Sequence, residues 1–531
     1  MAQLWSCGPT PAERWRARIC RPEQVAIELK GGRRMAHDTH TCNDETLDPA
    51  NWEDMRSLAH GMVDDAIARL QGLRDGPVWQ PMPDAMKAGF SSPPPKAPAP
   101  LEEVYADVTQ RLYPYAMGNI HPRFWAWYMG SGCLTGALAD FLAAIDGSNL
   151  GGGNTAASLV DRQVTDWLRQ MMGFPGGASG ALVNGGSMAN IVGLMAARNA
   201  MAGVDLHHHS VAEIDAPLRF YASDQVHACH MKAMNLLGLG GKALVRVATD
   251  HDFRMDVDAL RAAISADRSA GVRPACVIAT AGTTNTGAID PLPAIADLCR
   301  DEGIWLHIDG CIGALFSIAP SNRHLVAGIE RADSLALDLH KGLHAPFDVG
   351  CALLRDRKLH RATFAEDAEY LQVATRGLAA AEFLHDYGPE TTRGFRALKI
   401  WMMLRHHGVE TFGRLLDHTI EQARRLTAKI EAEPELVLMA PTATTVVCFR
   451  HAPVGMDEAA VRAHNTEIML RLQESGIAVI TDTTIRGQHC LRAAICNHRT
   501  RDDDLDLLVE EVLKIGAETL QSCTRPDSHL S

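Results

Sequence analysis

Between residues 180 and 355, short apolar segments alternate with longer segments of helical periodicity. Strands that are apolar throughout and are separated by helices predict a mostly parallel sheet covered by helices on both faces. This pattern places the chain in the α/β class and constrains its fold more than any other feature. The expected strands are 180–184, 218–223, 243–248, 275–282, 304–309, 334–339 and 350–355, and the expected helices between them are 188–202, 255–270 and 291–303.

The segments on either side of this region suggest further domains. A helix is expected over 52–74, and "SSPPPKAPAP" (91–100) reads as a stiff linker, since proline cannot continue a helix. A long helix begins near residue 393 and leads into a smaller α+β region. We therefore expect a disordered tail, an N-terminal helical segment with a Pro-rich linker, a large domain, a small C-terminal domain and a second tail, at 1–45, 46–118, 119–392, 393–522 and 523–531.

Composition excludes several classes of partner. The net charge of −13 provides no basic face for a nucleic acid, and no apolar run approaches the roughly 20 residues that span a bilayer. The 13 cysteines lack framework spacing, which is typical of reduced thiols in a cytosol. The N-terminus lacks the apolar region of a signal peptide, and translation from Met35 is an alternative to Met1. We expect a cytoplasmic protein without a nucleic-acid or membrane partner.

Four potentially reactive groups follow expected strands, where ligands collect in open α/β sheets. "VNGGSMAN" places Gly186 and Ser187 at a helix start, which suits a phosphate. His227 ends "YASDQVH", Asp309 ends "LHID", and Lys341 follows "SLALDL". Each has a more ordinary interpretation by itself: a capped turn, a structural histidine, a helix N-cap and a salt-bridged lysine.

Taken together, these groups are the parts that a pyridoxal 5′-phosphate (PLP) site requires. The lysine forms a Schiff base with the cofactor aldehyde, and the acid keeps the ring nitrogen protonated. The imidazole lies on the ring face, and the glycine turn with its serine holds the phosphate. Burial is expected to depress the pKa of Lys341, which favours exchange of the lysine for a substrate amine.

From about residue 50 to about 520, the chain resembles the group II PLP-dependent amino-acid decarboxylases, the family of aromatic-L-amino-acid and glutamate decarboxylases. The resemblance implies the type I PLP-dependent transferase fold, which is aspartate aminotransferase-like, and the conversion of an L-amino acid to its amine and CO2. It rests on motifs whose order and spacing match the family: "HPRFWAW" (121–127), "VNGGSMAN" (183–190), "SDQVH" (223–227), "TAGTTNTGAID" (280–290), "WLHIDG" (305–310), "DLHKG" (338–342), "FRALKIW" (395–401) and "LRAAICN" (491–497).

The resemblance also implies roles for single residues. Lys341 carries the cofactor, Asp309 faces the ring nitrogen, and His227 stacks on the ring. Thr280 supports the cofactor near its O3′ oxygen. The full cofactor-binding set is Gly186, Ser187, His227, Thr280, Asp309, Asp338, His340 and Lys341.

Tyr370, in "AEYLQ", matches a mobile-loop tyrosine that returns a proton to the substrate carbon after CO2 leaves. Family members with Phe or Asn at the positions of His227 and Tyr370 tend toward oxidative deamination and aldehyde products. Because both residues are retained, the sequence predicts a decarboxylase with Lys341, His227, Tyr370 and Asp309 as its catalytic residues. A surface aromatic residue in a loop is the alternative for Tyr370.

Three positions depart from the family pattern. Asp338 stands where aromatic members often have Asn near the phosphate, and an acid there is unfavourable unless it turns to another donor. Cys311 replaces a small Ala beneath the ring, and Gly342 replaces the common Trp or Met after the lysine. Each departure is expected to alter cofactor affinity or pocket shape without removing a reacting group.

The substrate and the assembly follow less directly from the sequence. Trp125 and Trp127, with the neighbouring Phe124 and Tyr128, suit an aromatic or apolar side chain, although plain core packing explains them equally well. Thr392 lies where family members vary between Gly and a hydroxylated residue. The resemblance also implies an obligate homodimer with the active site at its interface.

Three alternatives stay open at this point. The first is another PLP reaction on the same fold, by an aldehyde synthase, a lyase or an aminotransferase, and the second is a catalytically silent PLP-binding dimer. The third is a metal protein based on "HHH" (207–209) and "HACH" (227–230). Adjacent histidines point in different directions and Cys229 lacks a companion cysteine at zinc spacing, so we expect no metal.

Overall fold

The computed structural model describes residues 46–366 and 373–524. The chain divides into two compact units, residues 1–59 and residues 60–531. The described part of the first unit is 46–59, and α2 (Trp52–Gln71) begins there. The predicted tail 1–45 lies outside the described residues, as does 525–531.

A seven-stranded sheet forms the centre of the second unit, in the order β1-β7-β6-β5-β4-β2-β3. β7 runs antiparallel to both of its neighbours, and the other neighbouring pairs are parallel. The mostly parallel sheet expected from the sequence is confirmed. Its strands are β1 (Ser179–Val183), β2 (Leu218–Ser223), β3 (Leu244–Val247), β4 (Arg273–Thr280), β5 (Trp305–Asp309), β6 (Ser334–Asp338) and β7 (Gly350–Leu354).

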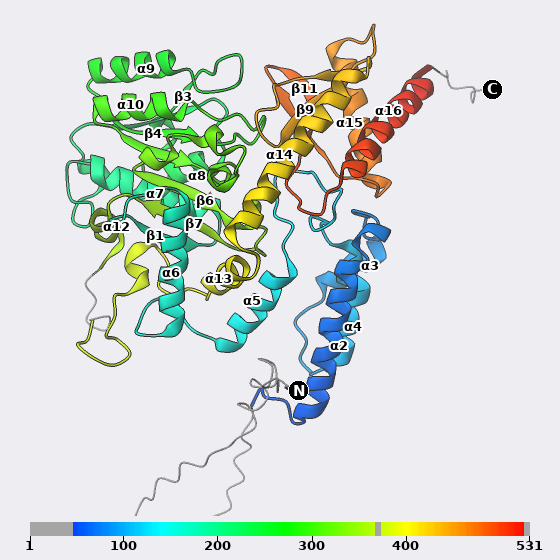
Figure 1. The fold of residues 1–531 in the computed structure, drawn as a ribbon, viewed down its shortest axis with the longest axis horizontal. Helices are drawn as coiled ribbons and strands as arrows, with labels where there is room; N and C mark the ends of the chain where they lie inside the picture. Colours follow the sequence, from blue (N-terminus) through cyan, green and yellow to red (C-terminus); the bar gives the residue numbers. More distant parts are fainter. Residues whose placement is uncertain (1–45, 367–372, 525–531) are drawn as a thin grey trace, which may run out of the picture. The chain divides into compact units, whose positions relative to one another are not determined.

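Helices cover both faces of this sheet (Figure 1). In β4, Cys276 and Ile278 pack in a cluster that includes α7 (Gly186–Met201) and α8 (Cys229–Leu236). The alternate residues Val277 and Ala279 pack in the cluster that contains α9 (Val257–Ser269) and α10 (Leu292–Glu302). Successive strand residues point to opposite faces, so this alternation places the two helix pairs on opposite sides.

The same alternation sets the direction of the polar side chains in β5 and β6. Leu306 and Ile308 belong to the cluster with α9 and α10, whereas His307 hydrogen-bonds to Asn190 of α7. Asp309, two residues after His307, therefore lies on the α7 and α8 side. Asp338 occupies the equivalent position in β6, since Leu335 and Leu337 face the other cluster.

A second, four-stranded sheet lies within the segment predicted as the C-terminal domain. Its order is β10-β11-β9-β8, and all of its pairs are antiparallel. The strands are β8 (Leu436–Leu438), β9 (Val446–His451), β10 (Thr481–Ile485) and β11 (Gln488–Ala494), and the helices beside it are α14 (Val409–Ala432), α15 (Glu458–Glu474) and α16 (Asp502–Thr524). The remaining α-helices within the described residues are α3 (Asp84–Ala88), α4 (Leu101–Asp107), α5 (Leu134–Asp146), α6 (Ala156–Met171), α11 (Leu339–Gly342), α12 (Arg357–Phe364) and α13 (Ala397–His407).

The single long helix expected from residue 393 is divided in the structure. α13 ends at His407 and α14 begins at Val409, with Gly408 between them at a φ of 79°. A positive φ interrupts the helical backbone, and glycine adopts such a φ without a steric penalty. None of the described helices is both long and apolar enough to cross a lipid bilayer.

The strand before Lys341 is one residue shorter than the expected 334–339. β6 ends at Asp338, and residues 339–342 form one helical turn, α11. The peptide at Gly130 lies against this turn, because a Cβ built on Gly130 would be 1.8 Å from the carbonyl oxygen of His340. Only a residue without a side chain fits there, so the "HPRFWAWYMG" segment forms one wall behind the lysine.

Candidate active site

The predicted site residues meet around one cavity of about 450 Å³ at the carboxyl ends of the sheet strands. Lys341 lines it from α11, Asp309 from the end of β5, and Thr280 from the end of β4. Thr280 and Asp309 are direct partners in the β4–β5 register. Segments far apart in sequence therefore converge because parallel strands end at the same edge. The predicted residues that line the cavity are Gly186, Ser187, His227, Thr280, Asp309, Asp338, His340 and Lys341.

The glycine turn after β1, at Gly185 and Gly186, lines this cavity. Gly185 has a φ of 130°, and α7 begins at Gly186. A Cβ built on Gly186 would lie 2.4 Å from the Sγ atom of Cys311 and 2.6 Å from the Oδ2 atom of Asp338. The turn can hold no side chain, and the first N–H groups of α7 remain available for an anion.

Asp309 is buried and has two donors. Its Oδ1 atom accepts from the backbone N–H of Cys311 at 3.2 Å, and its Oδ2 atom accepts from Nε2 of His230 at 2.9 Å. Burial raises the pKa of Asp309, but the hydrogen bond from His230 and the charge of that ring outweigh burial and hold the pKa well below its ordinary value. Asp309 is therefore an anion throughout the usable pH range.

Lys341 also meets an anion. Its Nζ atom lies 3.0 Å from Oδ2 of Asp338. Burial favours the neutral amine, yet the neighbouring charge of Asp338 prevails and raises the pKa of Lys341 above its ordinary value. The expectation that burial depresses this pKa was wrong, because the sequence did not indicate a carboxylate within reach of the amine. The pairing also supplies the donor that an acid at position 338 needs.

His227 and His340 occupy different environments in the cavity wall. The Nδ1 atom of His227 accepts from the backbone N–H of Cys229 at 3.2 Å, which fixes its ring at the cavity edge. The ring of His340 bonds through Nδ1 to the carbonyl of Val349 at 3.1 Å and packs against Phe347 with 4.6 Å between ring centroids. His340 is therefore held by the protein itself, whereas the face of His227 is exposed.

Two buried oxygen atoms in the cavity wall have no hydrogen-bond partner among the described residues: Oγ1 of Thr280 and Oδ1 of Asp338. Buried polar atoms are rarely left unpaired, so both point to a bound polar group. With an amine, an anionic acid and a glycine turn at a helix start in the same wall, the residues present fit PLP.

The other two departures from the family pattern have local structural explanations. A Cβ built on Gly342 would lie 2.8 Å from Cδ1 of Leu315, so a large residue does not fit in this packing. Cys311 lines the cavity, and burial raises the pKa of its thiol well above the ordinary value, which keeps the sulfur protonated. Neither residue removes a polar partner from the site.

A second cavity of about 400 Å³ shares Tyr128, His227 and Lys341 with the first. Trp127 and Arg492 line only this second cavity. Arg492 donates from Nη1 to the carbonyl of Trp127 at 2.7 Å and from Nε to that of Thr284 at 2.8 Å. Its Nη2 atom is buried and has no partner among the described residues, so one donor remains for a ligand.

Two functional candidates were missed by sequence reasoning. Arg492 lies in the recognised segment "LRAAICN", yet nothing in its spacing to Lys341 indicated a shared cavity. His230 was considered only as part of "HACH". The contact between His230 of α8 and Asp309 of β5 depends on how the helix packs on the sheet. A single sequence does not reveal this packing.

Of the predicted substrate residues, Trp127 lines the second cavity, whereas Trp125 and Thr392 line neither of these two cavities. Trp125 is fully buried in the C-terminal core, where its Nε1 atom donates to Thr500 at 3.2 Å. Thr392 lines a separate cavity that shares only Phe347 with the first. Tyr370 lies outside the described residues.

Comparisons with known proteins identify the family of this chain. The conserved-domain model of the pyridoxal-dependent decarboxylases matches residues 83–452. An aromatic-L-amino-acid decarboxylase from Bacillus atrophaeus is 32% identical over 475 residues, which cover 88% of this chain and 96% of the relative. A phenylacetaldehyde synthase from Arabidopsis thaliana is 28% identical over 465 residues, covering 85% and 93%.

A solved structure extends the comparison to the fold. The crystal structure of Oryza sativa TDC with PLP and tryptamine has a TM-score of 0.83 and 26% identity, and the match covers 89% of this chain and 100% of that one. The chain belongs to the pyridoxal-dependent decarboxylase family. The predicted family, fold class, PLP cofactor and carboxy-lyase activity are confirmed.

The pairing of Lys341 with Asp338 yields a prediction for the cofactor-free protein. In an Asp338→Asn variant, the anion that favours the protonated amine is gone while burial remains, so the pKa of Lys341 falls. The pH midpoint for acylation of Lys341 by acetic anhydride, followed by peptide mass spectrometry, should move down by at least about one pH unit. Asp301→Asn, at an exposed carboxylate on α10, serves as control, and an equal midpoint in all three proteins would contradict the assignment.

Proposed function

We propose that this protein converts an L-amino acid with an aromatic or apolar side chain to its amine and CO2, with PLP bound covalently to Lys341. The observation that carries the proposal is the convergence of Lys341, Asp309 and the glycine turn at Gly186 on one cavity of about 450 Å³. Bound PLP supplies a ring that withdraws the electron pair left on Cα when CO2 departs.

The residues of the chain have distinct tasks in this proposal. The N–H groups at the start of α7 and the hydroxyl of Ser187 bind the cofactor phosphate. Asp309, held as an anion, would keep a proton on the ring nitrogen, and the ring of His227 would contact the cofactor face. Thr280, with its unpaired Oγ1 atom, bonds to a polar atom at the cofactor edge.

Residues in the second cavity support the proposal that the substrate is an amino acid with an aromatic or apolar side chain. Trp127 and Tyr128 provide aromatic surface there, and the unpaired Nη2 atom of Arg492 offers a donor to the substrate carboxylate. An amino acid held by its carboxylate at Arg492 and by its amine near Lys341 would have a fixed orientation at Cα. Such positioning would favour loss of CO2 over loss of the α-proton.

Tyr370 distinguishes the proposed reaction from the alternative of an aldehyde synthase. By resemblance, its hydroxyl returns a proton to Cα after CO2 leaves, and the presence of a phenylacetaldehyde synthase among the relatives makes the alternative a real one. We propose the amine as the product because the chain retains both His227 and Tyr370.

A second copy of the chain is the proposed partner. α5 exposes an apolar stripe at helical spacing, formed by Leu134, Leu138, Phe141, Leu142 and Ile145, and Ile145 is 73% exposed. Such a stripe on a soluble protein favours burial against another surface. A homodimer with the active site at its interface is our proposal for the assembly.

The cytoplasm is the proposed location. The nine cysteines whose side chains the structure describes are free thiols, which is typical of a reducing compartment.

The first test concerns Lys341. Borohydride reduction of the PLP-loaded protein should attach the cofactor to the peptide containing Lys341, as seen by mass spectrometry. Lys341→Ala should lose this adduct, the visible absorption of the bound cofactor and all CO2 release from aromatic amino acids. Lys358→Ala, at an exposed lysine on α12, should retain all three. An adduct on another lysine in the unaltered protein would show that the site is misplaced.

The second test concerns the fate of Cα. A Tyr370→Phe variant lacks the proposed proton donor, so reaction of the electron-rich carbon with O2 gains over protonation. Its product should shift from amine toward aldehyde, with O2 consumption measured by an oxygen electrode. Tyr387→Phe is a matched control that should still give the amine. An unchanged amine yield in Tyr370→Phe would remove this residue from the mechanism.

The third test concerns the α5 stripe. Two charges placed in it by Phe141→Glu and Ile145→Glu should oppose burial and convert the dimer to a monomer, measured by light scattering after size-exclusion chromatography. Val454→Glu, which changes a fully exposed apolar residue in a loop, should leave the mass unchanged. A double variant that stays dimeric would show that the interface lies elsewhere.

A further inference from the structure

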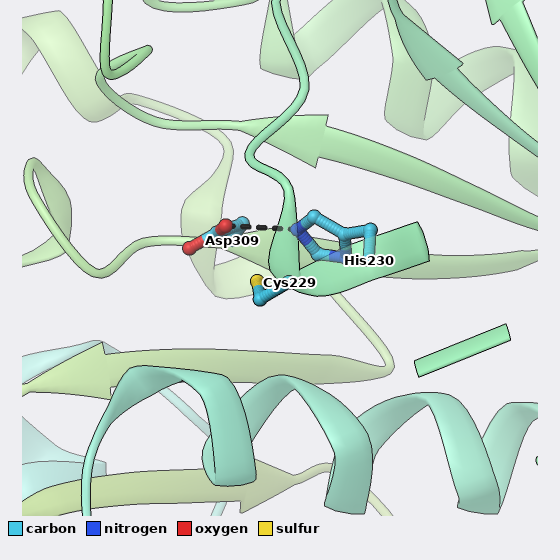
Figure 2. A group of neighbouring side chains, drawn as sticks. All are labelled: Cys229, His230 and Asp309. Atoms are coloured by element: carbon cyan, nitrogen blue, oxygen red, sulfur yellow. Dashed lines mark hydrogen bonds and ion pairs between the residues drawn. The ribbon is translucent and has the colours of Figure 1, made fainter. Parts of the chain in front are cut away.

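A buried histidine stands behind the carboxylate that the proposed function places against the cofactor ring. His230 lies at the start of α8 with no exposed surface, and its Nε2 atom donates to Oδ2 of Asp309 at 2.9 Å. Figure 2 shows the two side chains pointing toward each other, with Cys229 beside them. Its Nδ1 atom has no partner among the described residues.

This contact is more than a packing arrangement, because an imidazole and a carboxylate are both costly to bury alone. Backbone bonding satisfies Oδ1 of Asp309, so His230 is the side chain that completes the carboxylate. The Cys311 thiol also hydrogen-bonds to Asp309, but it lowers the pKa of the acid less than His230 does. The pair therefore sets the position of the acid before a cofactor is present.

The groups that face the pair come from several elements. Cys229 and His227 flank His230 on the α8 side, Lys341 approaches from α11, and His307 lies in β5 with its ring centroid 6.3 Å from that of His230. His307 is bonded to Asn190 and Ser334, and burial lowers its pKa to about 3, so it is neutral. Burial also lowers the pKa of His230, but hydrogen bonds and charge from Asp309 and Cys229 more than compensate and raise it to about 10. The pair therefore consists of a protonated, positively charged His230 and a negatively charged Asp309.

We propose that His230 is a positioning residue that orients Asp309 and withdraws charge from it, so that a proton shared with the cofactor ring nitrogen stays on the nitrogen. The inference rests on the proposed function, in which Asp309 faces that nitrogen.

The direction of the effect follows from competition for one proton. A carboxylate buried without a cation is strongly basic, and it would take the proton from the ring nitrogen. A donor with a positive charge on the opposite side of the carboxylate lowers its basicity. The nitrogen then keeps the proton, and the ring keeps its capacity to withdraw electrons.

Two variants separate orientation from charge. His230→Gln keeps an N–H donor for Asp309 but removes the charge, and His230→Leu removes both. Unaltered and variant holoenzymes are prepared with PLP labelled with ¹⁵N at the ring nitrogen. In the unaltered enzyme the nitrogen resonance should lie in the protonated range. It should move part of the way toward the unprotonated range in His230→Gln, and further in His230→Leu.

Cofactor affinity provides a second readout. The dissociation constant for PLP should rise by about ten- to a hundredfold in His230→Leu, as expected for loss of a hydrogen bond to a charged group, and less in His230→Gln. His307→Gln is the matched control, since this residue is equally buried and lies two positions from Asp309 without touching it. This control should lower the melting temperature without moving the nitrogen resonance.

Unchanged nitrogen resonances in both folded His230 variants would overturn the proposal. One equivalent of zinc that copurifies with the unaltered protein and is lost in His230→Gln would also overturn it, because Cys229, His230 and Asp309 would then be metal ligands. Failure of the proposed function looks different: the unaltered protein would give no borohydride adduct at Lys341. An adduct with unchanged nitrogen resonances rejects the role of His230 alone.

Discussion

Two carboxylates buried at the ends of adjacent strands determine how this site is built. Asp309 ends β5 and Asp338 ends β6, and both point to the face covered by α7 and α8. A carboxylate in such a position needs a cation, and each has one: His230 for Asp309 and Lys341 for Asp338. These two ion pairs therefore connect β5 to α8 and β6 to the turn that follows it.

Close approach of backbone to backbone is the second constraint on the site. Gly186 leaves no room for a Cβ between α7 and the side chains of Cys311 and Asp338, and Gly130 leaves none against His340. Both glycines lie in motifs recognised from the sequence. Because these residues lack side chains, the glycine turn and the "HPRFWAWYMG" segment can lie against the cavity wall around Lys341.

The structure also explains where simple rules about single residues gave the wrong result. Burial by itself predicts a depressed pKa for Lys341, yet an anion 3.0 Å away reverses the direction. Aromatic composition by itself placed Trp125 and Trp127 together, yet neighbouring residues diverge: Trp125 enters the C-terminal core and Trp127 lines the second cavity. In both cases the outcome depends on a partner from another element.

The sequence by itself determined the class of fold and the order of the seven strands along the chain, and its resemblance to a known family supplied eight residues of the cofactor cavity. The strands follow from local information, because apolar periodicity defines them and parallel strands end at a common edge. Only the tertiary structure decided that His230 meets Asp309, that Asp338 meets Lys341 and that Arg492 reaches the second cavity. Each of these contacts joins elements whose relative rotation is set by side-chain packing, and no local pattern in the sequence encodes that rotation.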